Sequence, residues 1–197
     1  LIPFDQLFGG GPNGDGRNPV YGLREYEGVT VNYPASYRRE VSSAAALTDA
    51  LGKGVSVILD ADIDFGSTQL AITGENQGVD LGGHGLTTAN NWGGISLKNG
   101  ASIKNGTITH AGNTAAIKAF NGSSVENVTI NATCATADKT VTGIAVQQGA
   151  NIESIKNVTI NGVSQGIEVG YQATVGLIEN AVVNESINGT AKGIGLV

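Results

Sequence analysis

From residue 55 to the end of the chain, apolar and polar residues alternate in short segments. Two of these segments are Ile144-Ala145-Val146 and Val158-Thr159-Ile160, and turn-forming residues separate them from their neighbours. A period of two residues predicts a β-strand whose side chains point alternately to its two faces. No stretch of this region has the period of an amphipathic helix. The pattern therefore predicts many short strands of about three to five residues.

The same region contains an internal repeat. Phrases such as ISLKNGASIKNGTI (95–108) and AAIKAFNGSSVENVTI (115–130) return with variable insertions. One repeat position holds an isoleucine and another holds an asparagine. The two sets are Ile95, Ile117, Ile144, Ile167 and Ile194, and Asn105, Asn127, Asn157 and Asn180. A repeat of about 20–50 residues is the signature of a solenoid, in which insertions lie in loops.

Strands and repeat together predict an all-β fold, a parallel β-helix over residues 55–197. About three strands would form one coil, with equivalent strands stacked about 4.8 Å apart. The repeated asparagines are expected at a bend, where each amide can bond the equivalent asparagine one coil away. The final residues lie in the middle of a repeat and no capping segment follows. We therefore expect the β-helix to continue beyond Val197.

A short amphipathic segment precedes the repeats. Residues 42–52, SSAAALTDALG, predict a helix: Ser42 or Ser43 can cap its first turn, and Gly52 suits a left-handed stop. So short a helix is only marginally stable alone. We therefore expect this helix to pack against another part of the protein.

Composition changes near residue 40. All prolines, all arginines and most aromatic residues lie before that point. Aromatic residues and arginines anchor interfaces, and this segment has no periodic core pattern. We expect residues 1–40 to be an extended docking or oligomerisation arm; the alternative is that they pack on the chain's own rod. The expected interface residues are Phe4, Phe8, Arg24, Tyr33, Tyr37, Arg38 and Arg39.

The overall composition narrows the class of protein. The 197 residues include 30 glycines, and only 14% are charged, which favours a β-rich extracellular or particle-borne protein. A net charge of −6 argues against a nucleic-acid partner. No apolar run approaches the ~20 residues that span a bilayer, so no membrane insertion is expected. The single cysteine, Cys134, excludes a disulfide within the chain. No cofactor is expected.

Three phrases carry a resemblance to a known family: VSVILDADIDF (55–65), VDLGGHGLT (79–87) and ISLKNGASIKNGTIT (95–109). They resemble the opening coils of the pectate-lyase-like right-handed parallel β-helix superfamily. The order of arm, helix and solenoid is most similar to that of phage tailspike and head-spike proteins. The resemblance implies a right-handed β-helix, a capping helix within residues 41–54 and a homotrimer.

The resemblance also implies a function. The chain would be a structural and glycan-binding component of a phage or phage-like particle, used in host surface attachment. Its partners would be other virion proteins, reached by the arm, and cell-surface polysaccharide. Its location would be the virion or the extracellular space. Two alternatives stay open, because a fold does not fix a function. One is a glycan depolymerase, a glycoside hydrolase or lyase with a β-helix groove, and the other is a secreted bacterial adhesin.

Three aspartates alternate along one predicted strand: Asp60, Asp62 and Asp64. A period of two residues would place their carboxylates on one face, where they could bind Ca²⁺. The spacing resembles an EF-hand loop, but Phe65 occupies the position that must be glycine. The alternative is a solvated, charged strand edge that discourages aggregation.

Other carboxylates are weak candidates for catalysis. Asp80 lies close in sequence to His84, and such a pair could transfer protons. Glu153 and Glu168 lie on successive predicted coils, and glycoside hydrolysis needs two carboxyl groups about 5–9.5 Å apart. No arginine follows Arg39, so the arginine base that the resemblance would imply for a lyase is missing.

One repeat position alternates in charge from coil to coil. It holds Lys104, Glu126, Lys156 and Glu179. Opposite charges that face each other on neighbouring strands stabilise a sheet. This alternation therefore predicts a ladder of charges along the outside of the rod, and it argues against a catalytic use of these two glutamates.

Overall fold

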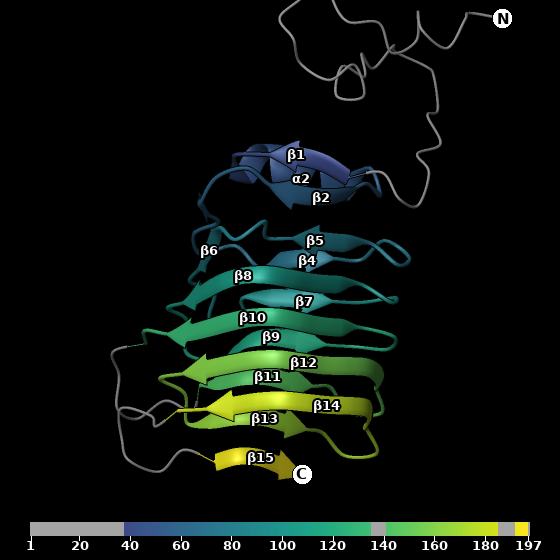
Figure 1. Cartoon of the computed structure of the whole chain (residues 1–197), viewed down its shortest axis with the longest axis vertical. Coiled ribbons are helices and arrows are strands. Elements are labelled where there is room, and N and C mark those ends of the chain that lie inside the picture. Colours follow the sequence, from purple (N-terminus) through teal and green to yellow (C-terminus); the bar gives the residue numbers. More distant parts are fainter. Residues whose placement is uncertain (1–37, 135–140, 185–191, 197) are drawn as a thin grey trace, which may run out of the picture.

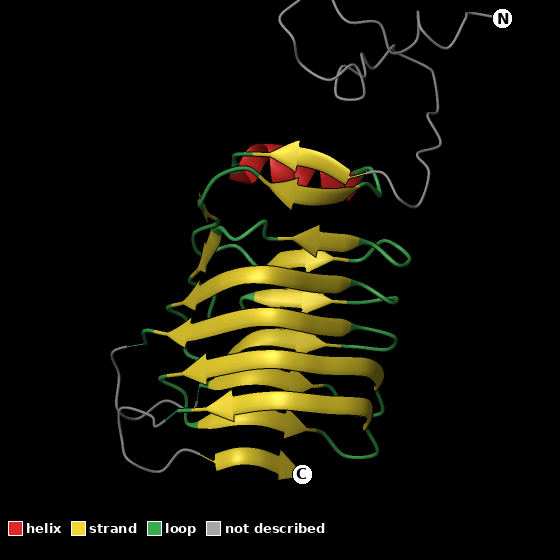
Figure 2. Ribbon diagram, in the orientation of Figure 1, coloured by secondary structure: helices red, strands yellow, loops and turns green. Residues whose placement is uncertain are grey.

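The computed structural model describes residues 38–134, 141–184 and 192–196. Within these residues the chain is a right-handed parallel β-solenoid of about five turns, with a short helix near its first coil (Figure 1; Figure 2). In Figure 1 the strands of one sheet run to the left in front, and those of the other run to the right behind them, while the chain descends. The predicted fold class is confirmed.

Two stacked sheets build the rod. The nine-stranded sheet has the order β1-β2-β5-β8-β10-β12-β14, and β3 and β6 pair beside this path. Its strands are β1 (Arg38–Val41), β2 (Ser56–Leu59), β3 (Ile63–Asp64), β5 (Gly78–Asp80), β6 (Gly85–Thr88), β8 (Ser102–His110), β10 (Ser124–Ala132), β12 (Asn151–Asn161) and β14 (Thr174–Val183). The six-stranded sheet has the order β15-β13-β11-β9-β7-β4. Its strands are β4 (Leu70–Ile72), β7 (Ile95–Leu97), β9 (Ala115–Ala119), β11 (Thr142–Val146), β13 (Gln165–Val169) and β15 (Lys192–Leu196).

The long strands of the first sheet turn a corner. The first part of β8 pairs with β5, and its last part pairs with β6. Between the two parts lies Asn105, whose φ of 61° is left-handed. Asparagine tolerates this conformation better than most residues, so it marks the bend. A coil therefore consists of three strand segments, two in this sheet and one in the other.

The isoleucine column forms the core between the sheets. Ile95, Ile117, Ile144 and Ile167 are successive Cα partners in β7, β9, β11 and β13, and all four are fully buried. Burying one such side chain contributes about 1.5–3 kcal/mol. Stacked identical side chains thus hold each coil on the next, which is why the repeat predicts the fold.

The helix α2 (Ala44–Gly52) packs near the first coil. The Ser43 hydroxyl caps it by accepting from the backbone N–H of Ala46 at 3.2 Å, and its buried face includes Leu47. The left-handed residue after the helix is Gly54, with φ of 73°, and not Gly52 as expected. No helix in the described part of the chain is long and apolar enough to cross a bilayer.

The first strand begins inside the predicted arm. β1 pairs in parallel with β2, so residues 38–40 belong to the sheet. The Arg39 guanidinium donates to Asp49 of α2 at 2.8 Å. The other expected interface residues lie outside the described residues, and their docking role stays a prediction; they are Phe4, Phe8, Arg24, Tyr33 and Tyr37. The continuation beyond Val197 also stays a prediction.

Candidate functional site

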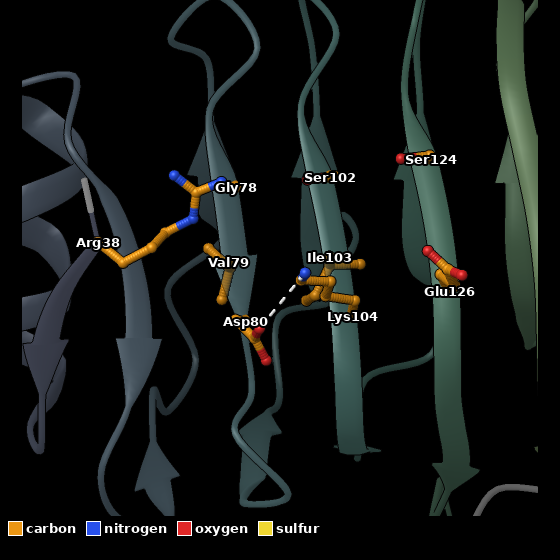
Figure 3. A pocket seen from close by; sticks show the side chains of 9 residues that line it. All are labelled: Arg38, Gly78, Val79, Asp80, Ser102, Ile103, Lys104, Ser124 and Glu126. Atoms are coloured by element: carbon orange, nitrogen blue, oxygen red, sulfur yellow. Dashed lines mark ion pairs between the residues drawn. The ribbon is translucent and has the colours of Figure 1, made fainter. Parts of the chain in front are cut away.

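A polar hollow of about 190 Å³ lies on the outer face of the nine-stranded sheet, across β1, β5, β8 and β10 (Figure 3). It is lined by Arg38, Gly78, Val79, Asp80, Ser102, Ile103, Lys104, Ser124 and Glu126. Sites for drug-sized ligands enclose about 300–1,000 Å³. This hollow is smaller, and it suits a single polar unit of a larger ligand.

The hollow exists because one residue in a row of serines is glycine. Gly78, Ser102 and Ser124 are Cα partners on β5, β8 and β10. On the other side, the Ser56 hydroxyl accepts from the Gly78 backbone N–H at 2.9 Å. A Cβ atom at position 78 would lie 3.1 Å from the Ser102 hydroxyl oxygen. The missing side chain therefore leaves space between hydroxyl groups.

Arg38 reaches over this space from β1. Its Cα partner is Ser56 on β2, and its guanidinium extends past that strand until it lies beside Gly78 (Figure 3). One terminal nitrogen lies 3.9 Å from the position that a Cβ of Gly78 would occupy. The sequence predicts Arg38 as an interface residue, and the structure places it at the hollow. A guanidinium offers several N–H donors in a planar fork, which matches a carboxylate.

Asp80 is held from several sides. Its carboxylate accepts from the Gly82 backbone N–H at 3.0 Å and from the Asn105 side-chain amide at 3.0 and 3.1 Å. It also pairs with the Lys104 ammonium at 3.5 Å. The structure does not pair it with His84, whose Nδ1 lies 3.5 Å from Asp62 instead. Asp80 therefore anchors the coil, and the acid–base pair considered from the sequence is not formed.

The outer row beside the serines alternates in charge. Asp80, Lys104, Glu126, Lys156 and Glu179 are successive Cα partners on β5, β8, β10, β12 and β14. Lys104 and Asp80 form an ion pair at 3.5 Å, and ion pairs near the surface contribute about 0–1 kcal/mol each. Within the hollow, Asp80 balances the charge of Lys104. Arg38 and Glu126 then stand at opposite ends of the hollow, as a donor and an acceptor (Figure 3).

The two glutamates considered for catalysis lie on different sheets. Glu153 belongs to β12 of the nine-stranded sheet, and Glu168 belongs to β13 of the six-stranded sheet. The Glu168 carboxylate accepts from the Thr142 hydroxyl at 3.3 Å. Neither glutamate lines the hollow. The fold therefore does not offer them as a pair to one glycosidic bond.

The three alternating aspartates are not gathered into a metal site. The strand predicted through them is broken, because β2 ends at Leu59 and β3 begins at Ile63. Asp62 accepts from the Gly85 backbone N–H at 2.7 Å, and Asp64 accepts from that of Gly66 at 2.9 Å. Residues 38–134, 141–184 and 192–196 contain no group of three or more His, Cys, Asp or Glu that could hold a metal ion.

The repeated asparagines form a ladder that ends at the hollow. The side-chain amide of each later asparagine donates to the side-chain oxygen of the asparagine one coil earlier. The donors are Asn127, Asn157 and Asn180, with distances of 3.1, 2.9 and 2.9 Å respectively. Asn105 receives the first of these bonds and donates to Asp80. The ladder residues are left-handed, with φ between 51° and 61°. This chain of amides fixes the coils beside the hollow.

Sequence reasoning missed several surface residues. Gly78 and its serine neighbours carry no sequence motif, and only the strand register brings them together. Two aromatic side chains stand out from turns: Trp92 is 80% exposed and Tyr171 is 60% exposed. Exposed aromatic rings are frequent binding elements. Neither ring lines the hollow, and their only sequence signal is a position in a turn-rich segment.

No protein-family model matches this chain, and comparisons with curated proteins and with solved structures find no match either. The fold defines the chain as a parallel β-solenoid. Solenoids of this kind serve many functions, so the fold alone selects none of them. The polar groups that line the hollow are therefore the best indication of function.

Proposed function

We propose that this protein is a structural and glycan-binding component of a phage or phage-like particle, and that it contributes to host surface attachment. The observation that carries the binding part is the hollow, in which serine hydroxyls lie between Arg38 and Glu126. Sugar hydroxyl groups both donate and accept hydrogen bonds. A site that alternates donors and acceptors in a small space suits them.

The scaffold under the hollow supports this role. β5, β8 and β10 pair along their lengths, and Val79, Ile103 and Val125 beneath the outer row are fully buried. Binding groups on paired strands lose little freedom when a ligand binds, since the strands already fix them. The particle role rests on the resemblance in organisation: an arm, a helix and a solenoid in this order.

A depolymerase is the weaker candidate at the same place. Asp80 and Glu126 lie two strand steps apart, or about 10 Å between backbones. Side chains at this spacing could reach the separation used by inverting glycosidases, about 6.5–9.5 Å. However, the Asp80 carboxylate already accepts from Gly82 and Asn105 and pairs with Lys104. Binding without cleavage therefore fits the hollow better.

The test fills the hollow and measures binding. The whole chain is titrated against immobilised capsule and lipopolysaccharide from candidate host strains by biolayer interferometry. Gly78→Val is expected to weaken binding at least tenfold, because a branched side chain would occupy the space beside Ser102. The backbone of Gly78 is not left-handed, so valine suits this strand.

Thr129→Val is the matched control for that experiment. Thr129 lies on β10 outside the hollow, and valine has the same shape. The control is expected to bind like the wild-type chain. Equal binding by Gly78→Val and the wild-type chain would contradict the hollow as the site. Failure of the wild-type chain to bind any of these polysaccharides would contradict the proposed function.

A further inference from the structure

We propose that His110 is an acid-sensitive latch between two turns of the rod, residues 89–94 and 111–114. The neutral imidazole holds these turns, here called the His110 corner, against each other. Protonation opens the corner while the coils around it keep their fold. None of the corner residues lines the hollow, so this response is separate from the proposed glycan site.

The His110 ring is fully buried at the end of β8. Its Nδ1 lies 2.9 Å from the hydroxyl of Thr88, its Cα partner on β6. Its Nε2 is buried and has no hydrogen-bond partner among the described residues, and the same is true of the Thr114 hydroxyl oxygen. An imidazolium donates from both nitrogens. Protonation would therefore bury a positive charge together with a donor that lacks an acceptor, which is strongly unfavourable.

The ring lies between a glycine from each of the two turns. A Cβ atom at Gly94 would lie 2.7 Å from Nδ1 of His110, and one at Gly112 would lie 2.8 Å from Nε2. Both distances are too short for a side chain, so the backbone of each turn closes directly on the ring. An imidazole that moves out to meet water must therefore displace at least one of the turns.

Few contacts hold the two turns together. The Asn113 backbone N–H donates to the Asn91 side-chain oxygen at 3.2 Å, and the Gly94 backbone N–H donates to the Ala115 carbonyl at 3.0 Å. The one large apolar side chain of the corner, Trp92, is 80% exposed. Segments that bury little apolar surface open locally at a small cost in free energy.

The strands next to the corner are held much more firmly. β7 and β9 follow the two turns, and their first inward isoleucines, Ile95 and Ile117, are fully buried Cα partners. Opening the corner leaves this column in place. A local opening therefore relieves the buried charge without unfolding the rod.

The charged groups around the corner do not replace this burial as the cause. On β3, β6, β7, β8, β9 and β10, in the two turns and in residues 133–134, the other titratable side chains are all at least partly exposed. They are Asp64, Lys104, Lys118, Glu126 and Cys134. Burial lowers the pKa of His110 to about 4, and hydrogen bonding with Thr88 opposes this shift. No charged side chain of the described residues contributes to it.

The direction of the pH effect follows from the two states. An open corner exposes the imidazole to water, where its pKa is about 6.5. The open state therefore binds the proton at a higher pH than the closed state does. The ratio of open to closed corners should rise about tenfold for each pH unit from about 6 down to about 4.

Amide hydrogen exchange of the whole chain, followed by NMR at pH 6.5, 5.5 and 4.5, measures this ratio. Protection is the intrinsic exchange rate of an amide divided by its observed rate. It is expected to fall about tenfold per pH unit at Gly94 and Asn113. The Gly100 amide is the control, since it donates to the Asn121 carbonyl at 3.0 Å in a turn outside the corner. Its protection should change less than about threefold over the whole range.

Three variants assign the response to the imidazole. His110→Gln is expected to remove the pH dependence at Gly94 and Asn113, because glutamine does not titrate. His84→Gln, at the more exposed histidine, is the matched control and should keep it. Thr88→Val removes the hydroxyl beside Nδ1 while keeping the side-chain shape. It should lower the protection at every pH and leave the dependence on pH in place.

Several outcomes would overturn the latch. Protection at Gly94 and Asn113 that stays constant with pH would show that the corner does not open. An equal fall at Gly100 would show a response of the whole rod. The same pH dependence in His110→Gln would assign it to another group. If that variant does not fold, the ring carbon signals of His110 in the wild-type chain decide, since a latch requires them to titrate over the range in which protection falls.

Discussion

The side-chain amide of Asn105 donates to both carboxylate oxygens of Asp80, at 3.0 and 3.1 Å. Asp80 therefore belongs to two structures at once, because it accepts the terminal bond of the asparagine ladder and also lines the hollow. The residues that hold the coils in register thus also shape the candidate site. Substitutions along the ladder should affect stability first, and binding only near Asp80.

Replacing Asp80 with alanine is expected to lower the free energy of unfolding by about 1–3 kcal/mol, because the half-buried amide of Asn105 loses its acceptor. Urea unfolding followed by circular dichroism measures this change. Asp60→Ala removes an exposed aspartate nearby and is expected to change stability by less than about 0.5 kcal/mol. Equal losses in the two variants would show that Asp80 does not anchor the ladder.

Asn127 has two roles in the ladder, since its amide donates a hydrogen bond and its backbone is left-handed. Two substitutions at this position separate these roles. Asn127→Gly removes the amide but keeps the left-handed backbone, whereas Asn127→Ala also places a Cβ in that conformation. Alanine is therefore expected to destabilise the chain by about 1 kcal/mol more than glycine does. The urea concentration at the midpoint of unfolding is measured for both variants. Identical midpoints would contradict a left-handed bend at this position.

His110 predicts a pH-dependent stability. Burial lowers the pKa of this imidazole to about 4, and its Nδ1 lies 2.9 Å from the Thr88 hydroxyl. In the unfolded chain the pKa is about 6.5, so between these values the unfolded state binds the proton first. His110 should therefore destabilise the fold as pH falls from about 6.5 to about 4, by up to about 3 kcal/mol.

The measurement compares urea unfolding of the wild-type chain and His110→Gln at pH 7.5 and pH 4.5. The variant is expected to lose clearly less stability between the two pH values, since glutamine does not titrate. His84→Gln removes the other, more exposed histidine and serves as the control. A His110→Gln chain that loses as much stability as the wild-type chain would exclude the buried imidazole as a source of the pH dependence.

The inward column predicts a strong effect of a buried charge. Ile144→Asp should lower stability by several kcal/mol and unfold neighbouring coils, since an unpaired carboxylate would replace a fully buried side chain. Thr129→Asp places the same group at an outward, partly exposed position of β10, and it should leave the thermal melting curve nearly unchanged. Wild-type melting of Ile144→Asp would show that the assignment of inward and outward positions is wrong.

The fold follows from the sequence because one residue type performs the same task in every coil. Ile117 is the Cα partner of Ile95, and Ile144 is the Cα partner of Ile117. The repeated isoleucine therefore predicts both where a strand lies in the sequence and which strand it pairs with. The asparagines predict the bend for the same reason. The later coils carry the clearest repeats.

The candidate site does not follow from the sequence, since it depends on a missing side chain and on neighbours from other coils. Gly78 has no special backbone conformation, and only its position between Ser56 and Ser102 makes it important. The pairing of Asp80 with His84 fails for a related reason. Gly82 and Gly83, with φ of 59° and 86°, turn the chain between Asp80 and His84. The His84 ring then lies beside Asp62 of the preceding coil.

Removal of residues 1–37 tests the docking arm, whose boundary follows from β1 beginning at Arg38. The truncated chain is expected to keep the β-sheet circular dichroism of the rod, because all the strands that the structure describes lie after the cut. The docking role predicts that the truncated chain loses the trimer, or the incorporation into a particle, that the resemblance implies. Analytical ultracentrifugation and mass spectrometry of purified particles measure these two properties. Normal assembly of the truncated chain, or collapse of its sheet signal, would contradict a docking role.

The hollow between Arg38 and Glu126 is the proposed sugar site. A crystal structure of the whole chain grown with fragments of the polysaccharides that bind in the titration proposed above tests this proposal. A sugar unit is expected on β5, β8 and β10, within hydrogen-bonding distance of Ser102 and Ser124. A fragment bound elsewhere, for example at the exposed ring of Trp92, with the hollow filled only by solvent, would contradict it.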